Sequence, residues 1–250
     1  MALFDAFDSI TEEIIKPADM AKKIEGFPET AVATFDNKII AQAATSEGAR
    51  RIGLLGGTQP RQIYELSRGG KRIAVWQTFI GGAASAGLLE LMIAKGAKKF
   101  VFFGTCGSLD KDATAGKLII PSEAYRDEGT SRHYMDASND YVKVETADRL
   151  AEIMREMNVP HIKARVWTTD AIFRETRGNM RKRRDEGCVA VEMECASVMA
   201  AGRFRGAQVY MFLFAHDSLD GPAWDRGENP VTDRTKEAYL NLALDIAVKI

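Results

Sequence analysis

Two carboxylates stand close together in an otherwise apolar stretch, where Glu192 and Glu194 flank Met193 in the segment AVEMECAS. A carboxyl group in apolar surroundings needs a hydrogen-bond partner, a ligand or a structural task. Two residues apart, the pair would share one face of a strand but would diverge around a helix. One glutamate could bind a ligand while the other supports the scaffold. The alternative is that both acids complement the dipole of a helix N-terminus.

A third carboxylate, Asp217, follows QVYMFLFA, the most hydrophobic run of the sequence. A carboxyl at the end of such a strand would be poorly solvated, which favours its protonated form and suits proton donation near neutral pH. The alternative is an aspartate that caps the next turn. His133, in EGTSRHY, joins the substrate-binding candidates, although a histidine in such a segment is more often structural.

The segment Thr105-Cys106-Gly107-Ser108 follows the apolar run KFVFFG and is predicted to be a tight turn after a strand. Its hydroxyls, backbone N–H groups and glycine suit a phosphate or a sugar. A turn without a ligand is the alternative, because the GK[ST] ending of a Walker loop is absent. A nucleophilic role for Cys106 is disfavoured, since no nearby residue in the sequence supplies a base.

The elements that must position these residues alternate between apolar strand-like runs and helical patterns, which indicates an α/β fold. In such sheets, ligands bind at the carboxyl ends of the strands, where the candidates above are found. No internal boundary is visible, so we expect one domain over residues 1–250. Strands are expected at 31–35, 52–55, 62–66, 72–79, 99–104, 118–121, 162–168 and 208–215, helices at 81–96, 146–157, 177–186 and 232–250, and a strand that changes to a helix at 189–203.

Composition excludes several classes of protein. The chain has 34 basic and 35 acidic residues among 250, a formal net charge of −1 that argues against nucleic-acid binding and against attraction to anionic membranes. No apolar run approaches the roughly 20 residues that span a bilayer, and the acidic N-terminus does not resemble a signal peptide. Three cysteines without zinc-type spacing predict no metal and a reducing cytoplasmic location.

Seven ordered motifs carry a family resemblance: IGGAASA, FFGTCGSL, GKLIIP, EGTSRHY, TTDAIFRET, AVEMECAS and FAHDSLDG. Together they resemble the nucleoside phosphorylase superfamily, which contains uridine phosphorylase, hexameric purine nucleoside phosphorylase and related nucleosidases. The resemblance runs from about Ile73 to Ala215 and leaves residues 1–50 as a divergent N-terminal segment. It implies a three-layer α/β/α domain around a twisted mixed sheet, and a homo-oligomer, either a dimer or a trimer of dimers.

The resemblance also implies a reaction, in which phosphate cleaves the N-glycosidic bond of a nucleoside to give a free base and (deoxy)ribose 1-phosphate. Phosphate would be a co-substrate, and no cofactor is implied. Asp217 would protonate or hydrogen-bond a departing purine, and Glu194 would bind the ribose hydroxyls. The other implied contacts are Met193 against the sugar, Thr105 to phosphate or ribose, and Cys106, Gly107, Phe173 and Glu192 around the base.

Departures from the family pattern keep other functions open. Phe102 stands where the phosphorylases usually have an arginine, and their GDPxR-type phosphate loop is absent, which leaves Arg61 as a candidate for binding phosphate. A phosphate-independent nucleosidase and a non-catalytic nucleoside-binding protein are therefore alternatives. Purines are slightly preferred because of Asp217 and the absence of a Gln-x-Arg pattern near 176–178. Uridine phosphorylase stays an alternative, because EGTSRHY is closer to the uridine enzymes.

Overall fold

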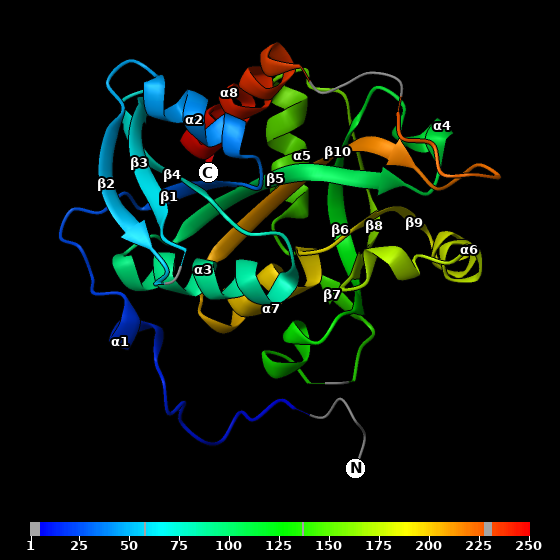
Figure 1. Cartoon of the computed structure of the whole chain (residues 1–250), viewed down its shortest axis with the longest axis horizontal. Coiled ribbons are helices and arrows are strands. Elements are labelled where there is room, and N and C mark those ends of the chain that lie inside the picture. The colour runs from blue at the N-terminus through cyan, green and yellow to red at the C-terminus, as the bar shows by residue number, and fades with distance from the viewer. Residues whose placement is uncertain (1–5, 58, 137, 228–231) are drawn as a thin grey trace.

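The structure is a computed structural model of the chain, and it describes residues 6–57, 59–136, 138–227 and 232–250. Within these residues one mixed sheet of ten strands forms the centre of the molecule (Figure 1). The strands are β1 (Thr30–Thr34), β2 (Arg50–Leu55), β3 (Arg61–Arg68), β4 (Lys71–Gln77), β5 (Lys99–Ser108), β6 (Leu118–Asp127), β7 (Tyr141–Lys143), β8 (His161–Thr169), β9 (Cys188–Glu192) and β10 (Gln208–Ser218).

The sheet combines an open part with a closed one. In the open part, β1 lies between β4 and β5 and runs parallel to both, while β2, β3 and β4 form an antiparallel meander. In the closed part, β5 pairs with β10, β10 with β6, β6 with β8, β8 with β9, and β9 again with β5. This ring of five strands brings the ends of β5, β9 and β10 together.

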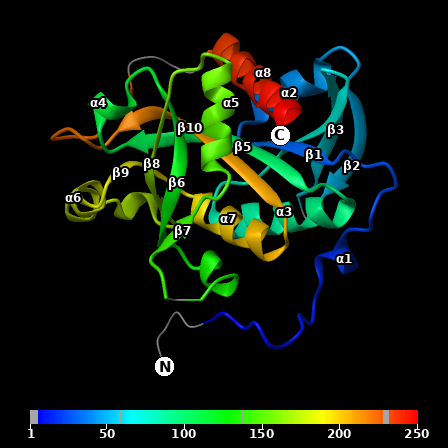
Figure 2. The ribbon, with the colours of Figure 1, turned by 180° about the vertical axis from the view of Figure 1, so that it is seen from behind.

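Helices cover the sheet on two sides, and this confirms the predicted three-layer α/β/α arrangement (Figures 1 and 2). One layer contains α2 (Asn37–Thr45), α5 (Ala147–Glu156) and α8 (Asp233–Lys249), and the other contains α3 (Gly82–Lys95) and α7 (Cys195–Phe204). The shorter helices are α1 (Pro17–Met20), α4 (Lys111–Thr114), α6 (Arg177–Asp185), η1 (Thr130–His133) and η2 (Ile172–Arg174). No helix of the described residues is both long and apolar enough to cross a bilayer.

Short sequence signals explain where two helices begin or end and where one hairpin turns. The Thr232 hydroxyl accepts a hydrogen bond from the backbone N–H of Thr235 at 3.2 Å and caps α8. Gly96 ends α3 with φ of 127°, a conformation that side chains disfavour. β3 and β4 pair as the hairpin that the SRGGK turn predicts. In the N-terminal segment, β1 is buried along its whole length and lies in the middle of the sheet, between β4 and β5.

Two strands continue further than predicted. β5 runs through Thr105–Ser108, which the sequence indicated as a turn, and β10 extends past Ala215 to Ser218. The two ends pair in parallel, with Gly107 opposite Asp217 and a bulge beside it. A Cβ atom on Gly107 would lie 2.8 Å from a methyl group of Leu219. The glycine therefore permits close packing between strands, and no turn is needed.

The helix α6 is rich in charged residues, but it is not fully exposed. Met180 and Arg183 are buried. The Arg183 guanidinium lies 3.6 Å from the centroid of the Tyr125 ring and 2.8 Å from a carboxylate oxygen of Glu186. The helix is therefore anchored beside the strand ends and can contribute to a site there.

Candidate active site

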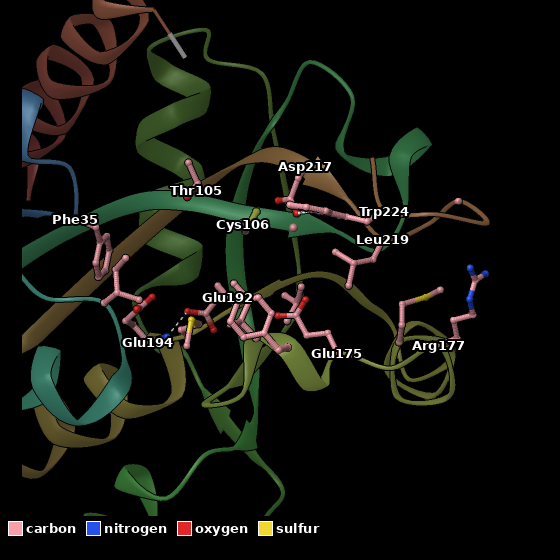
Figure 3. Close-up of a pocket in the computed structure, with 18 of the residues that line it drawn as sticks. Phe35, Thr105, Cys106, Glu175, Arg177, Glu192, Glu194, Asp217, Leu219 and Trp224 are labelled. Carbon is pink, nitrogen blue, oxygen red and sulfur yellow. Dashed lines mark hydrogen bonds between the residues drawn. The ribbon is translucent and has the colours of Figure 1, made fainter. Parts of the chain in front are cut away.

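A cavity of about 540 Å³ opens where the carboxyl ends of β5, β9 and β10 meet η2 and the start of α6 (Figure 3). This volume is in the range of small-molecule sites. The parallel pairing of β5 with β10 and the antiparallel pairing of β5 with β9 bring residues from distant parts of the sequence together. The predicted site residues that line the cavity are Thr105, Cys106, Gly107, Phe173, Glu192, Met193, Glu194 and Asp217.

Glu192 supports the scaffold beneath the cavity. Its carboxylate accepts hydrogen bonds from the backbone N–H groups of Glu194 and Cys195, both at 2.7 Å, and from the Thr168 hydroxyl. The first two bonds satisfy donors at the N-terminus of α7, as an acidic cap does. The side chain is only 5% exposed. Glu192 thus connects α7 to β8 and has little freedom to move toward a ligand.

Glu194 turns toward the other wall of the cavity. Its Oε1 accepts a hydrogen bond from the backbone N–H of Gly81 at 2.6 Å. Burial raises the pKa of both Glu192 and Glu194, and at Glu194 the negative charge of Glu192 adds to the effect. Because Glu192 accepts three hydrogen bonds, we expect Glu194 to be the last of the pair to ionise. The pair therefore offers one fixed carboxylate and one that can bind hydroxyl groups.

The IGGAASA motif explains how Gly81 reaches Glu194. Gly81 precedes α3 with φ of 101°, which an L side chain rarely adopts. A Cβ atom on Gly82 would lie 2.1 Å from the Ser197 hydroxyl oxygen, so α3 and α7 can approach this closely only with glycine there. The close approach brings the N-terminus of α3 to the carboxylate of Glu194.

Asp217 lies across the cavity in contact with the loop after β10. The indole N–H of Trp224 donates a hydrogen bond to Asp217 Oδ2 at 2.7 Å, and the Trp224 side chain is 60% exposed. Backbone hydrogen bonds between Ser218 and Asp225, at 2.8 and 3.0 Å, close the loop. The guanidinium of Arg226 lies 4.8 Å from the centroid of the Trp224 ring. The loop thus positions an indole between the carboxylate and solvent.

Thr105 and Cys106 are neighbours on β5, but only one of them has a side chain that is available to a ligand. Burial raises the pKa of the Cys106 thiol well above its usual value, and the charges of Glu192 and Asp217 add to this. The thiol is therefore neutral and a poor nucleophile, in line with the sequence interpretation. Thr105 is exposed, and no other described residue hydrogen-bonds to its hydroxyl. That hydroxyl can contact a ligand.

A sequence profile described as the phosphorylase superfamily matches residues 26–245. The chain belongs to this superfamily. The match begins well before Ile73, where the motif resemblance started, so the family region includes the central strand β1 and α2.

Individual relatives of this phosphorylase-superfamily chain are distant. A guanosine phosphorylase of Halorubrum lacusprofundi is 30% identical over 148 residues, which cover 58% of this chain and 61% of that relative. A DeoD-type purine nucleoside phosphorylase of an Exiguobacterium species is 26% identical over 188 residues, or 72% of this chain and 77% of the relative. The crystal structure of uridine phosphorylase from Vibrio fischeri superposes with a TM-score of 0.76 at 19% identity, covering 96% of this chain and all of that chain, which supports the fold.

Two predicted site residues of this superfamily member do not line the cavity. His133 is exposed at the end of η1 and lines a different cavity, next to the N-terminal segment. Arg61, at the start of β3, places its guanidinium 4.2 Å from the centroid of the Phe79 ring. Its Nε is buried without a hydrogen-bond partner in the described part of the chain, and Phe79 is next to Ile80 of the cavity wall.

The cavity has few positive charges. Phe102, at the position of the expected arginine, is fully buried and packs edge to face on Trp76 with ring centroids 5.7 Å apart. Among the described residues that line the cavity, Arg177 alone carries a positive charge, and Figure 3 shows it at the outer end. An anion bound deep in the cavity would therefore have to be held mainly by groups other than Arg177.

Sequence reasoning missed three cavity residues with charged or polar side chains, Glu175, Arg177 and Trp224. Glu175 belongs to the quoted TTDAIFRET motif, and its carboxylate type was the available signal. Trp224 carries no local signal, because its role depends on the loop that returns it to Asp217.

Proposed function

We propose that the protein is a nucleoside phosphorylase, which cleaves the N-glycosidic bond with phosphate and gives a free base and (deoxy)ribose 1-phosphate, with purine nucleosides preferred. The observation that carries the proposal is the placement of Glu194 and Asp217 on one cavity of about 540 Å³. The names of the guanosine and purine nucleoside phosphorylases among its relatives support the same reaction.

The chemistry assigns different tasks to the two carboxyl groups. Ribosyl transfer passes through a positively charged, oxocarbenium-like sugar, so the sugar must be held while the departing base is neutralised. Glu194, next to Met193, would bind the ribose hydroxyls. Asp217 would protonate or hydrogen-bond the purine ring as it leaves, and Thr105 would contact phosphate or ribose. In Figure 3, Asp217 lies beside Trp224, across the cavity from Glu194.

Phosphate binding is assigned to Thr105 and Arg61. The support for Arg61 is its buried, unpartnered Nε and its position on Phe79, beside the cavity wall. Phosphate is the co-substrate, and no other cofactor is proposed. Arg61→Ala should raise the KM for phosphate about 10-fold or more, with a smaller effect on the KM for the nucleoside. An unchanged KM for phosphate would exclude Arg61 from this role.

A phosphate-independent nucleosidase is the second candidate, and the burial of Phe102 in the core favours it. Base release from guanosine, inosine, adenosine and uridine, each measured with and without phosphate, separates the two. Release that requires phosphate supports the phosphorylase, whereas equally fast release without phosphate identifies a nucleosidase. Uridine as the best substrate would overturn the purine preference.

The third candidate function is a nucleoside-binding protein that releases no base, and the same protein preparation tests it. It requires that nucleosides raise the melting temperature while no base is released. For the enzyme, Asp217→Asn should lower kcat by roughly 10²–10⁴. The matched control is Asp220→Asn, because Asp220 lies on the same loop, pairs with Arg184 at 2.7 Å and does not line the cavity.

We further propose that the protein is a homo-oligomer, a dimer or a trimer of dimers, and that it acts in the cytoplasm. The support is its kinship with the phosphorylase superfamily. Sedimentation equilibrium at micromolar concentration measures the assembly, and a mass equal to one chain would overturn it.

A further inference from the structure

The helices α3 and α7 lie side by side, and the carboxylate of Glu194 joins their N-termini (Figures 1 and 2). Glu194 is the N-cap residue of α7, and Gly81, whose backbone N–H donates to its carboxylate, is the N-cap residue of α3. The carbonyl oxygen of Gly81 accepts a hydrogen bond from the Ser85 N–H at 3.1 Å, which ties Gly81 to the first turn of α3. The hydrogen bond to Glu194 therefore depends on how closely α3 approaches α7.

A serine of α7 fills the contact between the two helices. The Ser197 hydroxyl takes the place that a side chain on Gly82 would occupy, since a Cβ atom there would lie 2.1 Å from the hydroxyl oxygen. Ser197 stands in the first turn of α7 and is fully buried. Because Gly82 directly follows Gly81, this contact sets the spacing of the helices next to the hydrogen bond that Glu194 accepts.

A buried carboxylate fixes the direction of the Ser197 hydroxyl. A serine in a helix often donates its hydroxyl proton to a carbonyl oxygen of the preceding turn, whereas Ser197 donates to Glu128 Oε2. Glu128 is only 6% exposed, and it also accepts hydrogen bonds from the backbone N–H and the hydroxyl of Ser131 in η1. The guanidinium of Arg126 on β6 donates to the Ser131 hydroxyl at 2.8 Å. This network connects β6 and η1 to the contact between α3 and α7.

Burying a carboxylate and a hydroxyl costs more than packing apolar side chains of the same size, so stability of the fold alone does not account for the network. Neither Ser197 nor Glu128 lines the cavity, so neither contacts a substrate there. We propose that Ser197, oriented by Glu128, is a positioning residue, whose hydroxyl sets the spacing of α3 and α7 that keeps Glu194 on Gly81 and directed at the ribose. This inference rests on the proposed function.

Ser197→Ala tests the contact. The variant keeps a strong helix former, and Glu128 retains both of its donors from Ser131, so we expect it to fold. For the best nucleoside substrate, kcat/KM should fall about 5- to 30-fold, the scale of one hydrogen bond. The matched control is Thr146→Val, which removes a hydroxyl that donates to the carbonyl of Val209 beside α5, in the other helical layer. The control should stay within twofold.

A second background shows whether Ser197 acts through Glu194. Glu194→Ala leaves no carboxylate to position, so adding Ser197→Ala to it should lower kcat/KM less than twofold further. An equal loss in both backgrounds would overturn the proposal, because Ser197 would then act on another part of the protein.

Exchange of the Gly81 amide hydrogen, followed by NMR, reports on the positioning without turnover. In Ser197→Ala this hydrogen should exchange about 10-fold faster or more, while the amide of Leu89 in the middle of α3 keeps its rate. Equal acceleration at both amides, or none at Gly81, would show that the serine does not position Glu194. If the unmodified protein releases no base from any nucleoside, the proposed function fails, whereas acceleration confined to Gly81 still supports the positioning of Glu194.

Discussion

The carboxyl group of Glu194 is buried beside that of Glu192, and we expect Glu194→Gln to stabilise the protein in alkaline solution while removing most of its activity. The folded protein binds the Glu194 proton more tightly than the unfolded chain does, because burial and the charge of Glu192 raise the pKa above the ordinary value of 4.5. The free energy of unfolding therefore falls as the pH rises from about 4.5 through the folded-state pKa.

The expected gain follows from the same shift. Each pKa unit corresponds to about 1.4 kcal/mol, so even one to two units destabilise the ionised protein by about 1.4–3 kcal/mol. Glutamine carries no charge, and its carbonyl oxygen can still accept the hydrogen bond from Gly81 that is 2.6 Å long. For a chain of this size, the melting temperature at pH 9 should rise by about 3–9 °C, and the rise should shrink toward zero near pH 4.5.

Melting temperatures of the original protein and of Glu194→Gln, measured between pH 4.5 and 9, provide the assay. Glu237→Gln serves as the control, since Glu237 is exposed on α8 and should show no pH-dependent difference. In parallel, kcat/KM for a nucleoside should fall by roughly 10²–10³, because a charged hydrogen bond to the sugar is lost. A gain of equal size at pH 4.5 and pH 9, or a loss at pH 9, would refute the reasoning.

Two further substitutions test other contacts. Trp224→Phe keeps a ring but removes the 2.7 Å hydrogen bond to Asp217; because the indole is largely exposed, we expect kcat to fall only about 3- to 30-fold, and an unchanged kcat would show that the aspartate is positioned without it. Gly107→Val should lower the melting temperature by several degrees through overpacking, because a Cβ atom there would lie 2.8 Å from a methyl group of Leu219. Gly129→Ala is the control, since the space around Gly129 is open, and it should leave the melting temperature unchanged.

Much of the fold could be predicted because its signals are local. Apolar runs predicted β1 and β10, and the turn SRGGK predicted the β3–β4 hairpin. The closed ring of strands could not be predicted, because it depends on which strand β9 pairs with. The small residues at Thr105–Ser108 were misinterpreted for a similar reason. A Cβ atom on Gly107 would lie 2.8 Å from Leu219 and 3.0 Å from Val191, so the glycine leaves room for two side chains that are distant in the sequence.

The roles of the site residues also depend on contacts between residues that are distant in the sequence. From residue types and spacing alone, it stayed open whether Glu192 and Glu194 have different tasks and which of them binds a ligand; only the family resemblance assigned Glu194 to the sugar. The structure distinguishes them through partners far along the chain, since Thr168 on β8 hydrogen-bonds to Glu192 and Gly81 before α3 to Glu194. Trp224 could not be identified at all, because its contact with Asp217 requires the loop after β10 to return.

The position of Phe102 limits how phosphate can be bound. Its ring packs against Trp76 in a fully buried core, so a guanidinium in the same space would be an unpaired buried charge, which is costly. Phe102, at the position of the expected arginine, is therefore part of the packing between β5 and β4, the two strands that flank β1, and replacing it has a cost. Phe102→Arg should unfold the protein rather than improve phosphate binding. In the proposed phosphorylase, a cation for phosphate would therefore come from another element, and Arg61 on β3, the strand next to β4, is the proposed one, because its guanidinium has a buried Nε without a partner among the described residues.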